Sequence, residues 1–222
     1  MFKIRDKLQI GDIYIVSVEG DTSLLKNDLK LIDEKGNIFE IDTVGMPHYN
    51  NIKDSLIYAE LVLKCEVEAI GEIMQIMNNQ TIKRLEAAGW YADRKTNINI
   101  VEQKYREIGL EMPDNIRRFL IKFGMLKIDS PDKKYYDVEF NPLKAIGVNL
   151  DKSYFEQCLS EYGISNMVYP IGVACRENLI VLMTSEDVFY CFTDGCLIKA
   201  GDNIEEMLDC LVGECRDAII IE

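Results

Sequence analysis

The chain has 222 residues, of which 48% are hydrophobic and 28% are charged, and its formal net charge at pH 7 is −13. This composition is typical of a globular protein with well-filled cores, and it excludes a chain that is largely disordered. No run approaches the ~20 apolar residues of a membrane-spanning helix. The first six residues also lack the apolar region of a signal peptide. We therefore expect a cytoplasmic protein that does not bind a membrane.

The acidic charge is concentrated toward the carboxyl end. Residues 128–222 carry 18 acidic and 7 basic side chains, whereas residues 79–127 carry 6 acidic and 10 basic ones. An excess of carboxylates disfavours nucleic acid as a direct partner, because phosphate binding depends on lysine and arginine. It favours a basic protein partner, although a negative surface that serves solubility alone would explain the same charge.

The first part of the chain, residues 1–78, is predicted to form a small β-barrel. Residues 28–42 have the pattern of a hairpin whose turn is the EKGN sequence at 34–37. Further strands are expected at 12–18, 55–67 and 70–77. The polar NNQ sequence at 78–80 marks the boundary with a second domain, residues 79–222.

The second part has the pattern of an α+β domain. Apolar residues recur three and four apart over 81–89, 98–108 and 116–123, which predicts three helices. Thr81 is the expected N-cap of the first helix, and Gly89 is expected in the left-handed position after its end. The remaining predicted elements are a strand at 135–140, a helix at 153–163, strands at 167–175, 179–185, 188–192 and 196–200, and a helix from Asn203 to Gly213. This order predicts a mostly antiparallel sheet with flanking helices.

Arrangements of catalytic or metal-binding residues are scarce. The single histidine, His48, is expected in a barrel loop, and the chain has no glycine-rich phosphate-binding motif. The cysteine pairs 191/196 and 210/215 could supply four thiolates to zinc, but their positions at a hairpin turn and in an apolar helix favour packing instead. We therefore expect no catalytic residue, no cofactor and no metal, and we keep an enzyme or zinc protein as a less favoured alternative.

Several short motifs between residues 81 and 215 occur in an order that resembles the third group of the SUKH immunity-protein superfamily. The motifs are LEAAGWYADRK, FLIKFGML, VEFNP, VYPIG, DVFYCF and MLDCLVGE. The resemblance depends on Leu85, Gly89, Trp90, Arg94, Phe119, Leu120, Phe123, Gly124, Leu126, Phe140, Pro142, Tyr169, Pro170, Ile171, Gly172, Tyr190, Gly201, Leu208 and Gly213. Two features depart from the group: Met125 stands where a second glycine is common, and TSEDVFYCF is a loose version of the expected turn and strand.

The amino-terminal segments are more faintly similar to the second-domain barrel of elongation factor Tu and related translational GTPases. FKIRDKLQI is similar to the first strand of that barrel, LLKNDLKLID to a later strand and LVLKCEVEAIGEI to its last strands. The GTPase core is absent, so the similarity implies a barrel scaffold and no activity in translation.

The SUKH resemblance implies a bacterial immunity protein, an antitoxin that blocks a cognate toxin by binding it. In such systems the toxin is often a nuclease or a nucleic-acid deaminase. An intracellular adaptor or regulatory protein unrelated to toxins is the alternative function. The sequence indicates neither the toxin nor an oligomeric state.

The expected interface residues are acidic or aromatic. They are Asp129, Asp132, Asp187, Asp194, Asp202, Tyr135 and Tyr136. An acidic surface formed by such residues could imitate nucleic acid in front of a basic toxin. The only tryptophan, Trp90, is of a type favoured in interfaces. Its place just after Gly89 instead favours packing of the first helix against the sheet.

Overall fold

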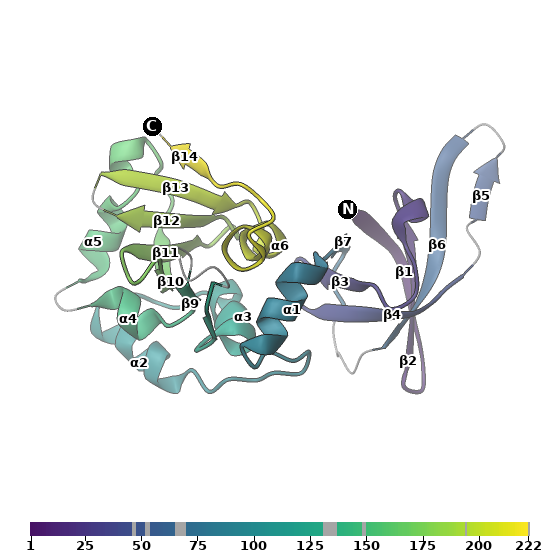
Figure 1. The fold of residues 1–222 in the computed structure, drawn as a ribbon, viewed down its shortest axis with the longest axis horizontal. Coiled ribbons are helices and arrows are strands. Elements are labelled where there is room, and N and C mark those ends of the chain that lie inside the picture. Colours follow the sequence, from purple (N-terminus) through teal and green to yellow (C-terminus); the bar gives the residue numbers. More distant parts are fainter. Residues whose placement is uncertain are drawn as a thin grey trace. The chain divides into compact units, whose positions relative to one another are not determined.

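The computed structural model describes residues 1–45, 48–51, 54–64, 70–130, 137–147, 150–193 and 195–221, with side chains omitted over 48–57. These residues form two compact units, Met1–Asn79 and Gln80–Glu222. The first unit is a β-barrel, and the second combines an antiparallel sheet with helices (Figure 1). The α+β class and the predicted barrel are therefore confirmed. None of the described helices is both long and apolar enough to cross a membrane.

The barrel of the first unit is closed by six antiparallel strands in the order β2-β1-β7-β3-β4-β6, with β2 also pairing with β6. The strands are β1 (Phe2–Ile10), β2 (Ile13–Glu19), β3 (Lys30–Asp33), β4 (Ile38–Val44), β6 (Asp54–Lys64) and β7 (Ile73–Ile76). A further strand, β5 (His48–Asn51), pairs with β6 outside the ring, and a 3-10 turn, η1 (Thr22–Leu24), follows β2. Alternate side chains point inward and form one core that contains Val16, Val18, Leu31, Phe39, Ile41 and Leu61, each fully buried. Burial of side chains of this size contributes about 1.5–3 kcal/mol each.

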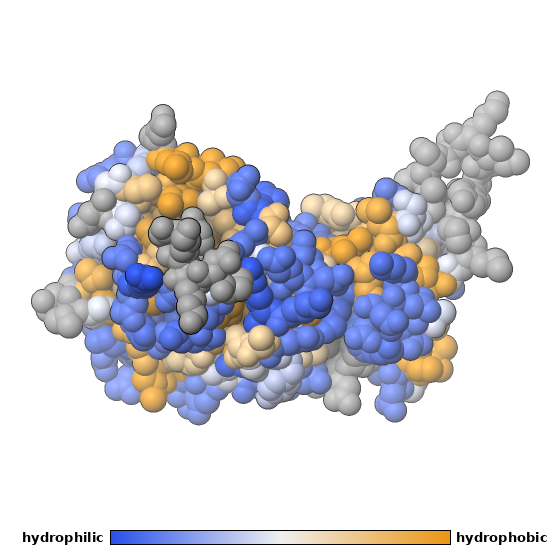
Figure 2. Space-filling view, viewed as in Figure 1, coloured by the Kyte–Doolittle hydropathy of each residue, from blue (hydrophilic) through white to orange (hydrophobic). Residues whose placement is uncertain are grey.

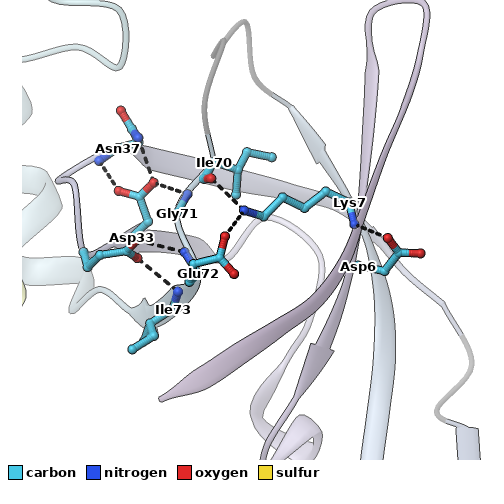
Figure 3. A network of polar contacts seen from close by, with 9 residues as sticks. Asp6, Lys7, Asp33, Asn37, Ile70, Gly71, Glu72 and Ile73 are labelled. Carbon is cyan, nitrogen blue, oxygen red and sulfur yellow. Dashed lines mark hydrogen bonds and ion pairs between the residues drawn. The ribbon is translucent and has the colours of Figure 1, made fainter.

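A polar network fixes the β3–β4 turn to the start of β7 (Figure 3). Asp33 is 3% exposed, and its carboxylate accepts hydrogen bonds from the backbone N–H groups of Lys35 at 2.9 Å, Asn37 at 2.7 Å and Gly71 at 2.9 Å. The neighbouring Glu34 carboxylate accepts from the N–H groups of residues 72 and 73 at 2.8 and 3.0 Å. Carboxylates at this turn therefore accept the hydrogen bonds of the N–H groups of residues 71–73 where β7 begins.

The second unit is built on a seven-stranded sheet in the order β14-β13-β12-β11-β10-β9-β8, in which every pair of neighbours is antiparallel. The strands are β8 (Lys127–Ile128), β9 (Val138–Glu139), β10 (Val168–Ala174), β11 (Leu179–Thr184), β12 (Phe189–Thr193), β13 (Cys196–Gly201) and β14 (Ile219–Ile221). Because spatial order follows chain order from β8 to β14, each strand lies beside the next one in the chain. The predicted antiparallel arrangement is confirmed.

Helices pack on both faces of this sheet. They are α1 (Asn79–Ala87), α2 (Asn99–Glu107), α3 (Asp114–Phe123), α4 (Pro142–Ile146), α5 (Lys152–Gln157), the 3-10 turn η2 (Ser160–Tyr162), α6 (Ile204–Leu208) and the π-helix η3 (Asp209–Gly213). Phe119 of α3 contacts the ring of Phe189 with centroids 5.7 Å apart, and Tyr154 of α5 contacts Phe192 at 6.4 Å. Residues 189 and 192 of β12 point to opposite faces, because side chains alternate along a strand. The two helices therefore cover opposite faces.

The end of α1 has the geometry of a Schellman motif. Gly89 has φ +90°, its N–H donates to the Glu86 carbonyl at 3.0 Å, and the Trp90 N–H donates to the Leu85 carbonyl at 2.9 Å. The expected left-handed glycine is thus present. The prediction that Thr81 is the N-cap is wrong, because the helix already begins at Asn79 and Thr81 is fully buried inside its first turn.

The sequence patterns missed three elements in the second unit. Residues 141–147 form the short helix α4, whose N-cap Asn141 accepts from the Leu143 N–H at 3.1 Å, where we expected only the end of a strand. The two-residue strand β8 and the last strand, β14, were not expected either, whereas the helix predicted from Asn203 to Gly213 is α6 followed by the π-helical turn η3. Of the strand expected at 135–140, the described part is β9, residues 138 and 139.

Candidate partner-binding surface

The structure describes three of the seven residues expected at an interface. Asp129, Asp187 and Asp202 are placed, whereas Asp132, Asp194, Tyr135 and Tyr136 lie outside the described residues. The antiparallel course of the sheet decides where the three carboxylates lie relative to one another.

Asp187 and Asp202 lie at the same end of the sheet. Phe189, near the start of β12, is paired with Gly201 at the end of β13. Asp187 precedes that pair in the β11–β12 turn, and Asp202 follows it in the turn before α6. We call Glu186, Asp187 and Asp202 the acidic edge.

The electrostatics of Tyr190 support this grouping. Burial raises the pKa of the Tyr190 hydroxyl, Lys199 opposes the increase, and the negative charges of Asp202 and Glu186 add to it. Both carboxylates are therefore close enough to influence one phenol. Lys199 also forms an ion pair with Asp202, which partly neutralises the acidic edge.

The Asp187 side chain has a defined position. The residue has φ +62°, a conformation that aspartate tolerates better than most residues. Its carboxylate accepts a hydrogen bond of 2.9 Å from the Asn115 side chain in the first turn of α3. The carboxylate is thus held by a helix and is half-buried, so part of it is available to a partner.

Asp129 lies at the opposite end of the sheet, in a region of mixed charge. It follows β8 directly, and its carboxylate is 3.7 Å from the Lys127 ammonium. Nearby, the Lys144 ammonium forms ion pairs with Glu139 at 2.9 Å and Glu177 at 2.6 Å. These contacts raise the pKa of Lys144 and keep it charged. The structure therefore does not bring Asp129 together with the acidic edge.

An open pocket of about 280 Å³ lies between one face of the sheet and the segment after α6. Val138, Ala174 and Cys191 are buried at its base, Leu179 and Ile198 are half-buried beside them, and Glu214, Arg216 and Asp217 bring charge to its lining. An apolar base with charged groups beside it is the common pattern of a site that accepts an apolar side chain or ligand.

The π-helix η3 forms one wall of this pocket and is held in place by α1. The Gln80 side chain donates to the Gly213 carbonyl at 2.6 Å, and Arg84 donates to the Val212 carbonyl at 2.6 Å. Arg84 also pairs with Glu214 at 3.1 Å, and the Thr81 hydroxyl donates to the Asp209 carboxylate. A Cβ atom at residue 213 would come within 2.2 Å of the Thr81 hydroxyl oxygen, so only glycine fits there. Single π-helical turns are rare and often occur at functional sites.

Three cysteines line the pocket, Cys175, Cys191 and Cys210, and the last two are among those expected as packing residues. Burial raises the pKa of the Cys210 thiol to about 11, and burial together with the neighbouring thiols Cys210 and Cys175 raises the pKa of Cys191 well above its ordinary value of 9.0. Both thiols are therefore neutral at pH 7. Among the described residues, no group of three histidine, cysteine or acidic side chains has a geometry that could hold a metal ion.

Sequence patterns did not indicate the pocket. Its base is distributed over five strands whose register cannot be read from local periodicity, and its charged residues follow the last predicted helix. The one available signal was the apolar run AIII at 218–221, directly after the polar residues Arg216 and Asp217.

Comparisons with known proteins give one match. A family model described as SUKH-3 immunity protein matches residues 77–214, which is more than half of the chain. The match includes nearly all of the second unit but ends before Arg216 and β14. No curated protein and no solved structure matches the chain.

Proposed function

The chain belongs to the SUKH-3 immunity protein family, and from this premise we propose that it is a non-enzymatic bacterial antitoxin that binds a cognate toxin and blocks it. The family match over residues 77–214 is the observation that carries the proposal. Because function depends on the site as well as the fold, the described surface must also suit a protein partner.

Two features of the second unit support binding to a basic toxin. The acidic edge presents carboxylates at one end of the sheet, and residues 128–222 together carry a net charge of −11. A surface of this sign accelerates association with a basic partner and opposes unrelated acidic ones. We propose that the toxin is a basic protein, such as a nuclease or nucleic-acid deaminase, and that the acidic edge occupies its nucleic-acid-binding surface.

The proposed function is tested by protection in cells. The gene adjacent to that of this chain is expressed from a controlled promoter, with and without the full chain. We expect the toxin to stop growth when it is produced alone and the chain to restore growth. A chain that gives no protection against the adjacent gene product would contradict the proposal.

Charge reversal tests the contribution of the acidic edge. We expect the double variant Glu186→Lys and Asp202→Lys to weaken toxin binding and to reduce the salt dependence of the association rate. Asp129→Lys is the control at the opposite end of the sheet, and it makes half the charge change of the double variant. If its effect on binding is half that of the double variant, only net charge matters, and no effect of either would remove the acidic edge from the mechanism.

A further inference from the structure

The edge strand β14 has one side without a partner among the described strands. It pairs with β13 in the register Leu197 with Ile221, Ile198 with Ile220 and Lys199 with Ile219, and it is the last strand in the order of the sheet. Alternate backbone N–H and C=O groups of an edge strand point away from the sheet. On β14 these groups can accept another extended chain.

The side chains of β14 lack the features that usually protect a sheet edge. Proteins commonly place lysine, proline or inward-pointing charges on edge strands to prevent pairing with other chains. Residues 218–221 are alanine followed by three isoleucines. Ile219 is 56% exposed and Ile220 is 66% exposed. Figure 2 shows hydrophobic side chains gathered at the place that β14 occupies in Figure 1.

The exposed strand is continuous with the pocket. Residues paired across an antiparallel ladder place their side chains on the same face, so Ile220 lies beside Ile198, which lines the pocket. Ala218, two residues before Ile220, lines the pocket as well. Ile220, Ile198 and Cys191 therefore form an apolar strip that runs from the free edge over the neighbouring strands.

We propose that β14 is the docking edge for an extended segment of the toxin, which adds to the sheet as an eighth strand and places apolar side chains against Ile219 and Ile220. This inference rests on the proposed function, since it names the partner of an immunity protein and the way that partner binds. Main-chain pairing supplies affinity in this kind of recognition, and alternate side chains supply specificity. Because β14 has only three residues, contacts with the apolar strip must add to the few backbone hydrogen bonds.

Charge favours a basic partner over a second copy of this chain. The ion pairs around β14 are internally balanced, as Arg216 pairs with Glu206 at 2.9 Å and Lys199 pairs with Asp202. The exposed carboxylate of Asp217, directly before residues 218–221, adds negative charge at this edge. Two copies would also each bring the net charge of −11 that residues 128–222 carry, and this repulsion opposes pairing of two β14 edges. The docked segment should therefore carry basic residues next to its apolar ones.

Amide hydrogen exchange of the full chain, free and bound to the protein encoded by the adjacent gene, tests the inference. In the free chain the N–H groups of β14 that point away from β13 should exchange rapidly. In the complex we expect the same amides to exchange at least about tenfold more slowly, because they become hydrogen-bonded to the added strand. If the outward amides of β14 exchange equally fast in a stable complex, the docking edge is wrong while the proposed function stands. If no complex forms, both fail.

Single substitutions provide a second readout. Ile220→Lys should leave the melting temperature unchanged, since the side chain is already mostly exposed, and should weaken binding by about 30-fold or more. Ile100→Lys on α2 is the matched control, because Ile100 is 70% exposed and belongs to a different element. Equal affinities of the two variants would overturn the inference. The inference would also be overturned if the free chain formed a dimer and Ile220→Lys dissociated it, because the edge would then bind a second copy of the chain.

Discussion

Trp90 stacks on Phe123 with ring centroids 6.4 Å apart and planes 11° from parallel. Trp90 follows the glycine that ends α1, and Phe123 is the last residue of α3, so the pair joins the ends of two helices. Trp90 is only 6% exposed. The ring therefore packs against α3, and its packing against the sheet stays a prediction. The tryptophan therefore serves the fold, and its burial leaves little of the side chain for direct contact with a partner.

Removal of this ring should destabilise the second unit. We predict that Trp90→Ala lowers the free energy of unfolding by about 3–5 kcal/mol, as for other large buried aromatic residues. Tyr91→Ala is the control, because Tyr91 is adjacent and 60% exposed, and its loss should change stability by less than about 0.5 kcal/mol. Denaturant unfolding followed by circular dichroism measures both, since Trp90→Ala removes the only tryptophan. A Trp90→Ala protein that unfolds at the normal denaturant concentration but no longer binds the toxin would reverse this interpretation.

Asp33 should be essential to the barrel. We predict that Asp33→Ala lowers the free energy of unfolding of the first unit by about 3 kcal/mol, because it leaves the N–H groups of Lys35, Asn37 and Gly71 without their acceptor. Amide exchange resolved by residue measures the effect in residues 1–45 separately from the second unit. Asp12→Ala, which removes an exposed carboxylate from the same barrel, should have little effect. Equal stabilities of the two variants would mean that the network contributes nothing.

Glu34 should make the barrel sensitive to acid. Burial raises the pKa of its carboxyl, but hydrogen bonds from the N–H groups of Glu72 and Ile73 outweigh this effect, so the pKa lies below the ordinary value of 4.5. Because the pKa is lower in the folded state than in the unfolded state, the carboxylate stabilises the fold at every pH above the unfolded pKa. This stabilisation is lost as the pH falls through the folded pKa. We predict that Glu34→Gln is less stable than the natural chain at pH 7 and that the difference shrinks progressively below about pH 4.5. A difference that is constant from pH 7 to pH 3 would contradict this assignment.

The cysteines should differ in reactivity in the folded protein. Burial raises the pKa of Cys191 and Cys210 strongly. Partial burial also raises the pKa of Cys215, but this residue is exposed to solvent. We predict that iodoacetamide at pH 8 labels Cys215 before Cys191 and Cys210, and that all react slowly until the protein is denatured. Peptide mass spectrometry after timed labelling gives the order. Rapid labelling of Cys191 in the folded chain would show that the pocket base opens to solvent.

Residues that carried the family resemblance proved to be residues of the fold. Leu85, Phe119, Phe140 and Leu208 are fully buried. Arg94 donates to the carbonyls of residues 122 and 124 at 2.9 and 2.7 Å and so satisfies the end of α3. Such positions are readable from sequence because their apolar periodicity and helix-end chemistry are local. They identify the family without indicating where a partner binds.

Features that depend on long-range pairing could not be predicted. The acidic edge exists because consecutive antiparallel strands bring residues 187 and 202 to one end, and the same course sends Asp129 to the other end. Met125, a departure from the family resemblance, adopts φ +61°, a left-handed conformation that favours glycine. A short apolar run such as 218–221 equally fits a strand or part of a helix, which is why β14 was missed.

A stoichiometric titration tests whether this chain neutralises a toxin by occupying it. The purified product of the adjacent gene is held at a concentration far above the dissociation constant, and its activity is measured as the full chain is added. If the chain acts by occupying the toxin, activity falls linearly and reaches zero at one chain per toxin. Complete inactivation by a small fraction of an equivalent would instead indicate catalysis by the chain, and full toxin activity at an excess of the chain would show that it does not occupy the toxin.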